Sequence, residues 1–394
     1  MNQQSRIYAD YAASAPLRPE AAEAMERVAT ELNPAGQYKT GRDARRILEE
    51  SREQIADLLG ADPVEVVFTS SGTEADNIAI QGQALAAAAH RGARTIVSTN
   101  TEHPAVLESV QWLCDGPLDF GFRHRELPVD AYGRVDPRDP DTAQLLAELR
   151  DNPSDTALLT CMWANNETGN INPVATILDG QDSIATHVDA VQVVGHLPID
   201  FHSLGAKTLA ASAHKFGGPR STGFLLASRH ADILSPIRGG GQERGLRSGT
   251  VNVQGAAGTA AALASAMENM ERENLAVRAA RDAIAEVART LDDVRIWTEE
   301  PALPGHLHMS LPGAEGDSLI MLLDAAGVDA STGSACSSGV NRASHVLTAM
   351  GVDVAVARGA LRLTVGKGTS IPDATRIAQL LPGIVEQART AGMA

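Results

Sequence analysis

The sequence predicts an α/β fold with a large, mostly parallel sheet and a second, smaller α+β domain. Short β-branched and apolar runs alternate with helical patterns between residues 64 and 227, which is typical of parallel sheets covered by helices on both faces. A long stretch rich in Ala, Glu and Arg, residues 252–291, indicates a helix leading out of this region. The strand-like and helical segments beyond it are enough for a small domain of their own.

Within the large domain, helical spacing of apolar residues first predicts helices at residues 19–30 and 43–59. A strand, a turn and a helix then follow one another repeatedly. We expect strands at residues 64–69, 95–99, 157–163, 186–190, 208–210 and 223–227, and helices at 74–89 and 104–113. In such sheets, ligands bind beyond the C-terminal ends of the strands, so polar residues at those ends are candidates for a site.

The small domain is predicted from four segments after the long helix. Strands are expected at residues 306–311 and 360–365, and helices at 316–326 and 372–390. The 394 residues and their 43% hydrophobic content suffice for two cores. We therefore predict a large domain at residues 15–255 and a small domain formed by residues 1–14 and 256–394.

Charge and hydropathy exclude several classes of protein. Lys and Arg number 33 against 49 Asp and Glu, and the net charge of −16 argues against nucleic acid as a direct partner. Residues 1–6 lack the apolar core of a signal peptide, and no segment is apolar for long enough to span a bilayer. The sequence thus indicates a cytoplasmic protein with no membrane partner. The three cysteines, at positions 114, 161 and 336, show no paired spacing and suggest neither disulfides nor zinc.

One lysine stands at the end of a predicted strand. Lys215 follows the apolar run 208–210, inside the segment Ala-Ser-Ala-His-Lys-Phe-Gly-Gly that starts at Ala211. For an isolated His-Lys pair, a surface lysine beside a glycine turn is the ordinary interpretation. The alternative is an amine at the mouth of a site, able to form a Schiff base with a carbonyl cofactor such as pyridoxal phosphate.

Other strand ends carry polar residues that suit such a cofactor. The turn at residues 71–74, Ser-Gly-Thr-Glu, offers backbone N–H groups and hydroxyls to a phosphate, although ordinary helix caps use the same residues. Asp189, three residues before Gln192, places a carboxylate where a pyridinium nitrogen needs one, although aspartate is also a routine cap. His103 is placed to stack over a ring or shuttle protons, or simply to begin a helix.

Two loops complete the set of candidates. Residues 237–250 combine glycines with three arginines, which suits a phosphate contact within the chain or across a dimer; a plain surface connection is the alternative. Cys336 lies among small and polar residues, 331–339, which do not build a core. An exposed cysteine on such a loop is a liability unless it is reactive, so we interpret Cys336 as functional. Cys161, within an apolar strand, is interpreted as packing.

Together with the segment Tyr-Ala-Asp-Tyr-Ala-Ala at residues 8–13, these motifs resemble the cysteine desulfurases, in the long-loop group of the aminotransferase-like pyridoxal-phosphate superfamily of fold type I. The resemblance runs over nearly the whole chain. It implies conversion of L-cysteine to L-alanine, with the sulfur moved to Cys336 as a persulfide, for iron–sulfur cluster assembly or tRNA thiolation. It also implies a homodimer that meets an iron–sulfur scaffold protein or a tRNA-thiolation acceptor.

The resemblance further implies roles by position. Lys215 in Ser-Ala-His-Lys matches the Schiff-base lysine, His103 in Thr-Glu-His the stacking histidine and acid/base, and Cys336 in Gly-Ser-Ala-Cys the sulfur acceptor. Arg362 in Leu-Arg-Leu matches the clamp for the substrate carboxylate. The matched cofactor contacts are Gly72, Thr73, Ser212 and His214 at the phosphate, Asp189 at the ring nitrogen, Gln192 and Asn166 at the ring hydroxyl with Asn166 also facing the substrate, and Thr250, which reaches the partner subunit's phosphate.

Alternatives stay open beside this interpretation. A selenocysteine lyase or an aminotransferase of the same fold is one, although an aminotransferase would not need a cysteine on a loop at about residues 331–344. A non-catalytic paralogue that docks sulfur-transfer partners is another. The resemblance also makes Cys336 a candidate transient ligand of an iron–sulfur cluster shared with a scaffold. One departure concerns residues 33–41, which lack a serine and a histidine that the family often has there.

Overall fold

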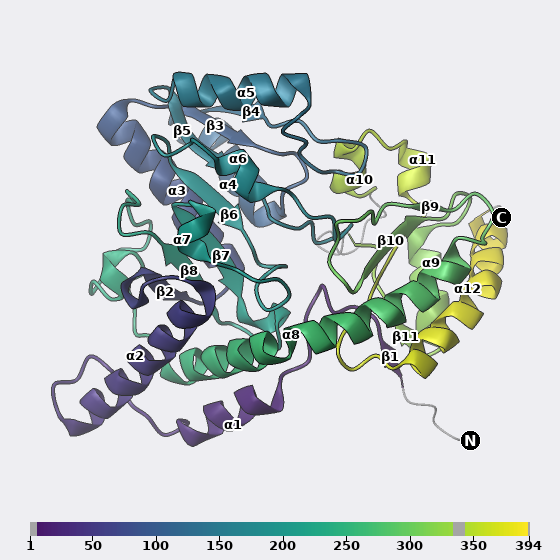
Figure 1. The fold of residues 1–394 in the computed structure, drawn as a ribbon, viewed down its shortest axis with the longest axis horizontal. Coiled ribbons are helices and arrows are strands. Elements are labelled where there is room, and N and C mark those ends of the chain that lie inside the picture. The colour runs from purple at the N-terminus through teal and green to yellow at the C-terminus, as the bar shows by residue number, and fades with distance from the viewer. Residues whose placement is uncertain (1–5, 334–342, 393–394) are drawn as a thin grey trace.

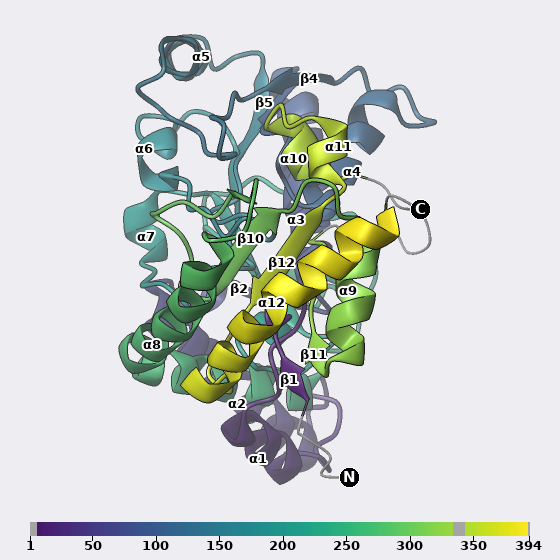
Figure 2. The same cartoon turned by 90° about the vertical axis from the view of Figure 1, so that its right-hand side faces the viewer.

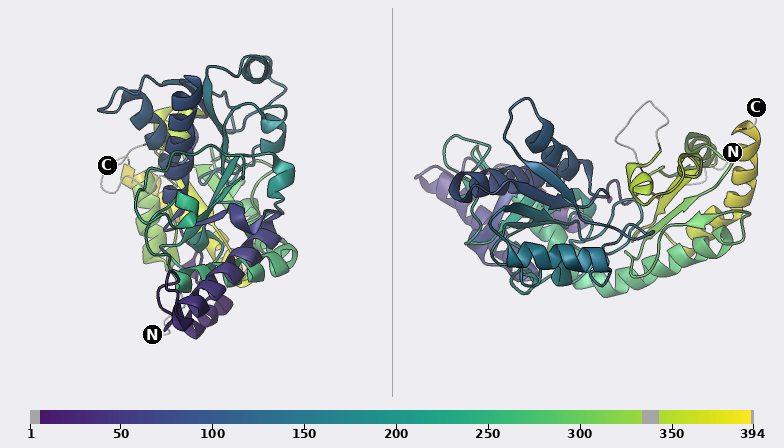
Figure 3. Two further views of the ribbon diagram at one scale, coloured as in Figure 1. Left: turned by 90° about the vertical axis from the view of Figure 1, so that its left-hand side faces the viewer. Right: turned by 90° about the horizontal axis from the view of Figure 1, so that it is seen from above.

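The computed structural model describes residues 6–333 and 343–392 (Figure 1). Cys336 lies outside the described residues. Two groups of secondary structure lie side by side, joined by the long helix α8 (Val253–Ala288), as Figure 3 shows from above. In the described part of the chain, no helix has the length and apolarity needed to cross a membrane.

A seven-stranded sheet forms the centre of the larger group. Its strands β3, β4, β5, β6 and β7 are parallel, whereas β8 runs antiparallel to its neighbours β2 and β7. This arrangement confirms the prediction of a mostly parallel sheet. In spatial order the strands are β2 (Val66–Thr69), β8 (Gly223–Ala227), β7 (Thr208–Ser212), β6 (Thr186–Asp189), β5 (Thr156–Thr160), β3 (Thr95–Ser98) and β4 (Arg123–Glu126).

Helices cover this sheet on both faces. One face buries its apolar side chains against α3 (Gly72–Arg91) and α4 (Pro104–Asp115), which also contact each other. The other face buries them against α2 (Lys39–Leu59), α5 (Pro140–Asp151) and the first half of α8. The remaining elements of this group are α1 (Pro19–Arg27), α6 (Val174–Leu178), α7 (Phe201–Leu204) and the 3-10 turns η1 (Pro63–Glu65), η2 (Ala213–Lys215) and η3 (Glu243–Gly245).

The predicted strands of this sheet are confirmed to within a few residues, because five of the six are wholly buried and therefore carry continuous apolar runs. The short helices α6 and α7, the 3-10 turns and two longer elements were not predicted. Strand β4 reads Arg-His-Arg-Glu and is exposed along its whole length, since it lies at the edge of the sheet. Helix α5 was also missed, although Asp139 caps its first turn by accepting from the N–H groups of Asp141 and Thr142.

The smaller group contains two further sheets. Strand β10 (His306–Ser310) pairs antiparallel with β12 (Ala360–Thr364) and β9 (Arg295–Ile296). Strand β1 (Ile7–Tyr8), at the start of the described chain, pairs in parallel with β11 (Val328–Asp329). Figure 2 shows α12 and α9 over these strands. The helices of this group are α9 (Gly316–Ala325), α10 (His345–Ala349), α11 (Val354–Ala357) and α12 (Ile371–Gly392).

Helix α8 contributes to both cores. Leu263 and Ala266 pack in the core of the large sheet, whereas Val277 and Ile284 pack in the core of the small group. The helix was predicted at residues 252–291 and extends over 36 residues. The chain also crosses between the groups near its start, from β1 to α1. The division at residues 14 and 255 stays a prediction.

Candidate active site

Lys215 lies just beyond the end of β7, in the 3-10 turn η2. Its Nζ donates hydrogen bonds to the carbonyl oxygens of Ala12, at 2.6 Å, and Ala13, at 3.1 Å. The turn is possible because Gly217 has a φ of +87° and because a Cβ on Gly218 would lie 2.7 Å from the Cβ of Ala213. Residues 12 and 13 thus cover Lys215, which lies in the connection between the antiparallel strands β7 and β8.

Asp189, at the end of β6, and Gln192, three residues further on, lie near Lys215. The Asp189 carboxylate accepts a hydrogen bond from the N–H of Val191 at 2.9 Å. Burial raises the pKa of Asp189 to about 6, against the lowering effects of that hydrogen bond and of Lys215. Gln192 Nε2 donates to the carbonyl oxygen of Ala12 at 3.1 Å, so Gln192 and Lys215 meet at one carbonyl.

His103 is the N-cap of α4. Its Nδ1 accepts a hydrogen bond from the N–H of Ala105 at 3.1 Å. Burial is the main cause that lowers the pKa of His103 to about 4, and the charges of Lys215 and His345 lower it further. At neutral pH the ring is therefore neutral and carries its proton on Nε2. His103 and Thr73, in the first turn of α3, line one groove of about 540 Å³.

The glycine turn before α3 packs against the ends of the neighbouring strands. A Cβ on Gly72 would lie 2.7 Å from Val191 Cγ2 and 3.2 Å from Ser212 Cβ, so only glycine allows this approach. His214 contacts Ser14 Oγ through Nδ1 at 3.2 Å, and burial, Lys215 and Arg220 lower its pKa to about 4. The structure thus places Gly72 beside Ser212, and His214 beside Ser14, next to the end of β7.

Arg362 reaches the site from the other sheet group. It is buried in β12, where it donates to the carbonyl oxygen of Asn166 at 2.8 Å and pairs with Asp10 at 2.6 Å. Within the described ranges, Nε of Arg362 and Oδ1 of Asn166 are buried and make no hydrogen bond. Buried polar atoms are normally paired, so these two atoms have hydrogen-bonding capacity that the described residues do not use.

Two predicted residues are not part of this cluster. Thr250 is exposed on the loop before α8 and lines a separate cavity of about 410 Å³ together with Asn33, Arg52 and Glu243. The structure does not bring Thr250 to Lys215 within one chain. Cys336 has no described position. Cys161 is buried, as predicted for a packing residue.

Sequence reasoning missed the contribution of residues 10–13. Asp10 orients Arg362, and the carbonyls of Ala12 and Ala13 hold Lys215. The motif at residues 8–13 contributes to the family resemblance and carries no local signal for these contacts. Nothing in the sequence shows a contact between Asp10 and a residue 352 positions away.

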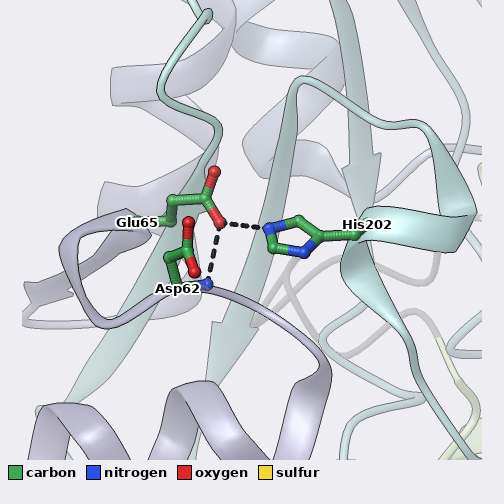
Figure 4. Close-up of side chains that lie close together, drawn as sticks. All are labelled: Asp62, Glu65 and His202. Carbon is green, nitrogen blue, oxygen red and sulfur yellow. Dashed lines mark hydrogen bonds and ion pairs between the residues drawn. The ribbon is translucent and has the colours of Figure 1, made fainter.

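A possible metal cluster exists elsewhere in the described chain, and its groups already have partners (Figure 4). Donor atoms of Asp62, Glu65 and His202 lie within 4.8 Å of one another. However, Glu65 Oε2 pairs with His202 Nε2 at 2.7 Å and accepts the N–H of Asp62 at 2.9 Å (Figure 4). Arg229 pairs with the Asp62 carboxylate at 2.9 Å. These contacts indicate a structural role for the cluster, which connects η1, α7 and the segment after β8.

Comparisons with known proteins agree with this geometry. The family model described as Aminotransferase class-V matches residues 7–365. An "IscS-like cysteine desulfurase" of Mycobacterium tuberculosis is 44% identical over 98% of both chains. The chain belongs to the cysteine desulfurase family of class-V aminotransferases.

Other members of the cysteine desulfurase family show the same full-length match. A "Cysteine desulfurase IscS" of Dictyoglomus turgidum is 40% identical over 98% of this chain and 95% of its own. A solved "NifS-like protein" superimposes with a TM-score of 0.85 at 32% identity, covering 97% of this chain and all of that one. The predicted fold type and family are thereby confirmed.

The cofactor of these enzymes is pyridoxal phosphate, and the residues present fit it. Lys215 supplies a primary amine at a strand end, and Asp189 a buried carboxyl close enough to interact with it. The close approach at Gly72 brings the start of α3 beside Ser212, and helix N-termini favour anions. The unpaired Oδ1 of Asn166 offers an acceptor to a ring hydroxyl.

Proposed function

We propose that this protein is a cysteine desulfurase, which converts L-cysteine to L-alanine and transfers the sulfur to Cys336 as a persulfide. The observation that carries the proposal is that residues 10–12 join both sheets: Lys215 and Gln192 donate to the carbonyl oxygen of Ala12, and Arg362 pairs with Asp10. The names of the full-length relatives support the same activity.

Each cofactor contact is part of the proposal. Lys215 holds the cofactor covalently, and Asp189 faces its ring nitrogen. When bound, pyridoxal phosphate supplies an electron sink for bonds broken at the substrate's α-carbon. The other proposed contacts are Gly72, Thr73, Ser212 and His214 at the phosphate, Gln192 and Asn166 at the ring hydroxyl, and Thr250 from a second copy of the chain.

The substrate is held and its protons are moved by residues of this chain. Arg362 binds the α-carboxylate of cysteine, since a guanidinium pairs with both carboxylate oxygens. Lys215 Nζ takes the α-proton and later returns a proton to the product. His103 exchanges its proton through Nε2, because Nδ1 is occupied by the N–H of Ala105. Asn166, whose backbone carbonyl accepts a hydrogen bond from Arg362, also faces the substrate.

Sulfur transfer then takes place at Cys336. Its thiolate attacks the sulfur of the bound cysteine, so a sulfur–sulfur bond forms while the carbon–sulfur bond breaks. The electron pair of the broken bond stays with the substrate carbon, which takes up a proton and becomes the methyl group of alanine. A free thiol has a pKa of about 8.5, so Cys336 needs local assistance to react near neutral pH.

Partners and location extend the same proposal. The exposure of Thr250 supports a homodimer in which the loop of one copy completes the site of the other. The relatives named IscS support delivery of sulfur to an iron–sulfur scaffold protein or a tRNA-thiolation acceptor, with Cys336 as a transient cluster ligand. A cytoplasmic location agrees with the finding that no described helix is fit to span a membrane.

The test is an assay of alanine and sulfide with L-cysteine and a reductant. We expect stoichiometric alanine and sulfide from the wild type, and neither product from Lys215→Ala or Cys336→Ala. Cys114→Ser is the matched control, because Cys114 is a half-buried thiol away from the site, and it should retain full activity. A wild type that binds the cofactor and releases neither product would contradict the proposal.

Selenocysteine separates the main alternative from the proposal. Cys336→Ala should lose release from cysteine and keep release from selenocysteine, because selenium leaves without the help of a thiol and the added reductant converts it to selenide. Equal loss with both substrates would refute a sulfur-specific role of Cys336. Turnover of selenocysteine alone by the wild type would assign the protein as a selenocysteine lyase.

A further inference from the structure

A buried carboxyl–imidazole pair links α3 to β6 behind the candidate site. Asp76 Oδ1 lies 3.1 Å from His187 Nε2, and both side chains are almost fully buried. Asp76 is one helical turn after Gly72, so the two residues lie on the same side of α3. His187 is two residues before Asp189, so both side chains point to the same face of the sheet. The roles proposed above do not use this pair.

The hydrogen bonds around His187 indicate where its proton lies. His187 Nδ1 is 2.9 Å from Thr208 Oγ1, which also accepts from Gln83 Nε2 at 2.8 Å and donates to the carbonyl oxygen of Thr186 at 3.2 Å. A hydroxyl has one proton and two lone pairs, so its remaining lone pair takes a proton from Nδ1. His187 Nε2 then has no proton, and the hydrogen bond to Asp76 requires a protonated carboxyl.

Electrostatics favour the same arrangement. The ionisable groups facing Asp76 are the carboxyls of Asp189 and Glu102, and its hydrogen-bond partner is the imidazole of His187. Burial raises the pKa of Asp76 well above its usual range, and these two carboxyls raise it further. Burial also lowers the pKa of His187 to about 3. A neutral acid beside a neutral imidazole leaves Asp189 free to carry the charge that faces Lys215.

Resting on the function proposed above, we propose that Asp76 and His187 are positioning residues for the cofactor. They share one proton and fix the spacing between the helix start at Gly72, which faces the phosphate, and Asp189, which faces the ring nitrogen. The site is then preorganised before the cofactor arrives, so less binding energy is lost in ordering it.

Asp76→Asn and Asp76→Leu test the pair in opposite ways. Asparagine keeps an N–H donor for His187 Nε2 and matches a neutral acid, so it should bind the cofactor as tightly as the wild type. Leucine leaves the buried imidazole nitrogen without a partner, so cofactor affinity should fall by about tenfold or more. The pH at which the bound cofactor changes its absorbance should also shift in Asp76→Leu, because Asp189 is displaced.

Gln83→Leu is the matched control. Gln83 lies on the same face of α3, two turns further from the site, and bonds to Thr208 in the same network. This variant should lose apo-protein stability and keep wild-type cofactor affinity. We would measure the unfolding midpoint of each apo-protein, the dissociation constant of added pyridoxal phosphate, and the absorbance of the bound cofactor against pH.

Several results would overturn the proposal. They are wild-type affinity in Asp76→Leu, equal loss of affinity in Gln83→Leu, or equal loss in Asp76→Asn, which would mean that the charge of Asp76 matters. If Asp76→Leu fails to fold, ring-nitrogen NMR of the wild type decides: a proton on Nδ1 of His187 supports the pair, and a proton on Nε2 contradicts it. The cofactor titration needs no substrate, so a wild type that desulfurates cysteine while Asp76→Leu binds normally overturns this inference alone.

Discussion

The guanidinium of Arg362 is held by the oxygens of Asn166 and Asp10, and its Nε has no hydrogen-bond partner among residues 6–333 and 343–392. Asp10 pairs with one of its nitrogens at 2.6 Å, and the Asn166 carbonyl accepts from another. This side chain is therefore oriented before a substrate arrives. A ligand carboxylate meets a cation that has little freedom left to lose.

Replacing Asp10 should weaken substrate binding more than it slows the reaction. We expect Asp10→Asn to raise KM for L-cysteine by about tenfold, with a smaller change in kcat, because a charged hydrogen bond that orients Arg362 becomes a neutral one. Steady-state kinetics measure both constants. Asp329→Asn is the control, since Asp329 forms an exposed pair with Arg6 at 2.5 Å. An unchanged KM in Asp10→Asn would show that Asn166 alone orients Arg362.

Glu102 is a second residue whose environment makes a specific prediction. Burial raises its pKa to about 8, although hydrogen bonds from the Met162 N–H and the Thr99 hydroxyl lower it. The folded protein therefore keeps a proton on Glu102 between about pH 4.5 and 8, where the unfolded chain releases it. Stability falls as pH rises through this window, by at most about 1.4 kcal/mol per pH unit.

Glu102→Gln should remove this pH dependence. Glutamine is neutral at every pH and keeps the acceptor used by Met162 and Thr99, so the variant should gain stability relative to the wild type as pH rises. Denaturant unfolding of the apo-proteins at about pH 5 and about pH 8 measures the difference. Glu108→Gln, at an exposed position of α4, should show no such trend. A constant difference between Glu102→Gln and wild type would mean that Glu102 is ionised in the fold.

At the scale of elements, the glycine-rich loop at residues 237–250 is anchored by one carboxylate. Glu243 accepts two hydrogen bonds from Arg52, at 2.9 and 2.8 Å, and one from the N–H of Phe68 at 2.7 Å. Glu243 and Arg244 have φ angles of +48° and +58°, which non-glycine residues rarely adopt. The anchoring contacts thus hold a strained turn on α2 and β2, and with it the loop that carries Thr250.

Breaking this anchor should affect both stability and the cofactor. We expect Glu243→Gln to lower the free energy of unfolding by roughly 3 kcal/mol, because the guanidinium of Arg52 loses its buried counter-charge and keeps only the exposed Glu49. Pyridoxal phosphate should also dissociate faster, because Thr250 is no longer held. Glu49→Gln is the matched control: Glu49 contacts Arg52 from its exposed side at 3.0 Å, and its loss should cost less than about 1 kcal/mol. Equal effects of the two variants would contradict the anchoring role.

At the scale of the molecule, α8 determines whether the two sheet groups unfold together. Its 36 residues extend over roughly 54 Å and contribute to both cores. Leu275, near its middle, is 66% exposed and packs little. Leu275→Pro removes a helical hydrogen bond and costs about 3 kcal/mol at a point between the cores.

We therefore expect one unfolding transition in the wild type and two in Leu275→Pro, observed by calorimetry of the apo-protein. KM for L-cysteine should rise as well, because Arg362 and Lys215 lie on opposite sides of the break. Leu275→Ala keeps the helix and should keep a single transition. A single transition in the proline variant would show that other contacts couple the two groups.

The residues explain why some of this molecule was predictable from its sequence. Lys215 and Asp189 were placed correctly at strand ends because buried parallel strands carry continuous apolar runs. Strand β4 was missed because its charged, exposed residues lack that signal. The pairs Arg362–Asp10 and His187–Asp76 join residues 352 and 111 positions apart, and local patterns carry no trace of such contacts. The domain boundaries and the residue roles stay predictions.

The pairing of β1 with β11 has a consequence for the time course of synthesis. Ile7 pairs with Val328, and Asp10 with Arg362. The first described residues therefore complete their contacts only after residues near the end of the chain have been synthesised. In a nascent chain that has just exposed Lys215, the carbonyls of Ala12 and Ala13 are not yet in their final place. Arg362, which is proposed to bind the substrate carboxylate, has not yet been synthesised. We expect release of sulfide to begin only after β12 has left the ribosome, which keeps unfinished chains from consuming cysteine.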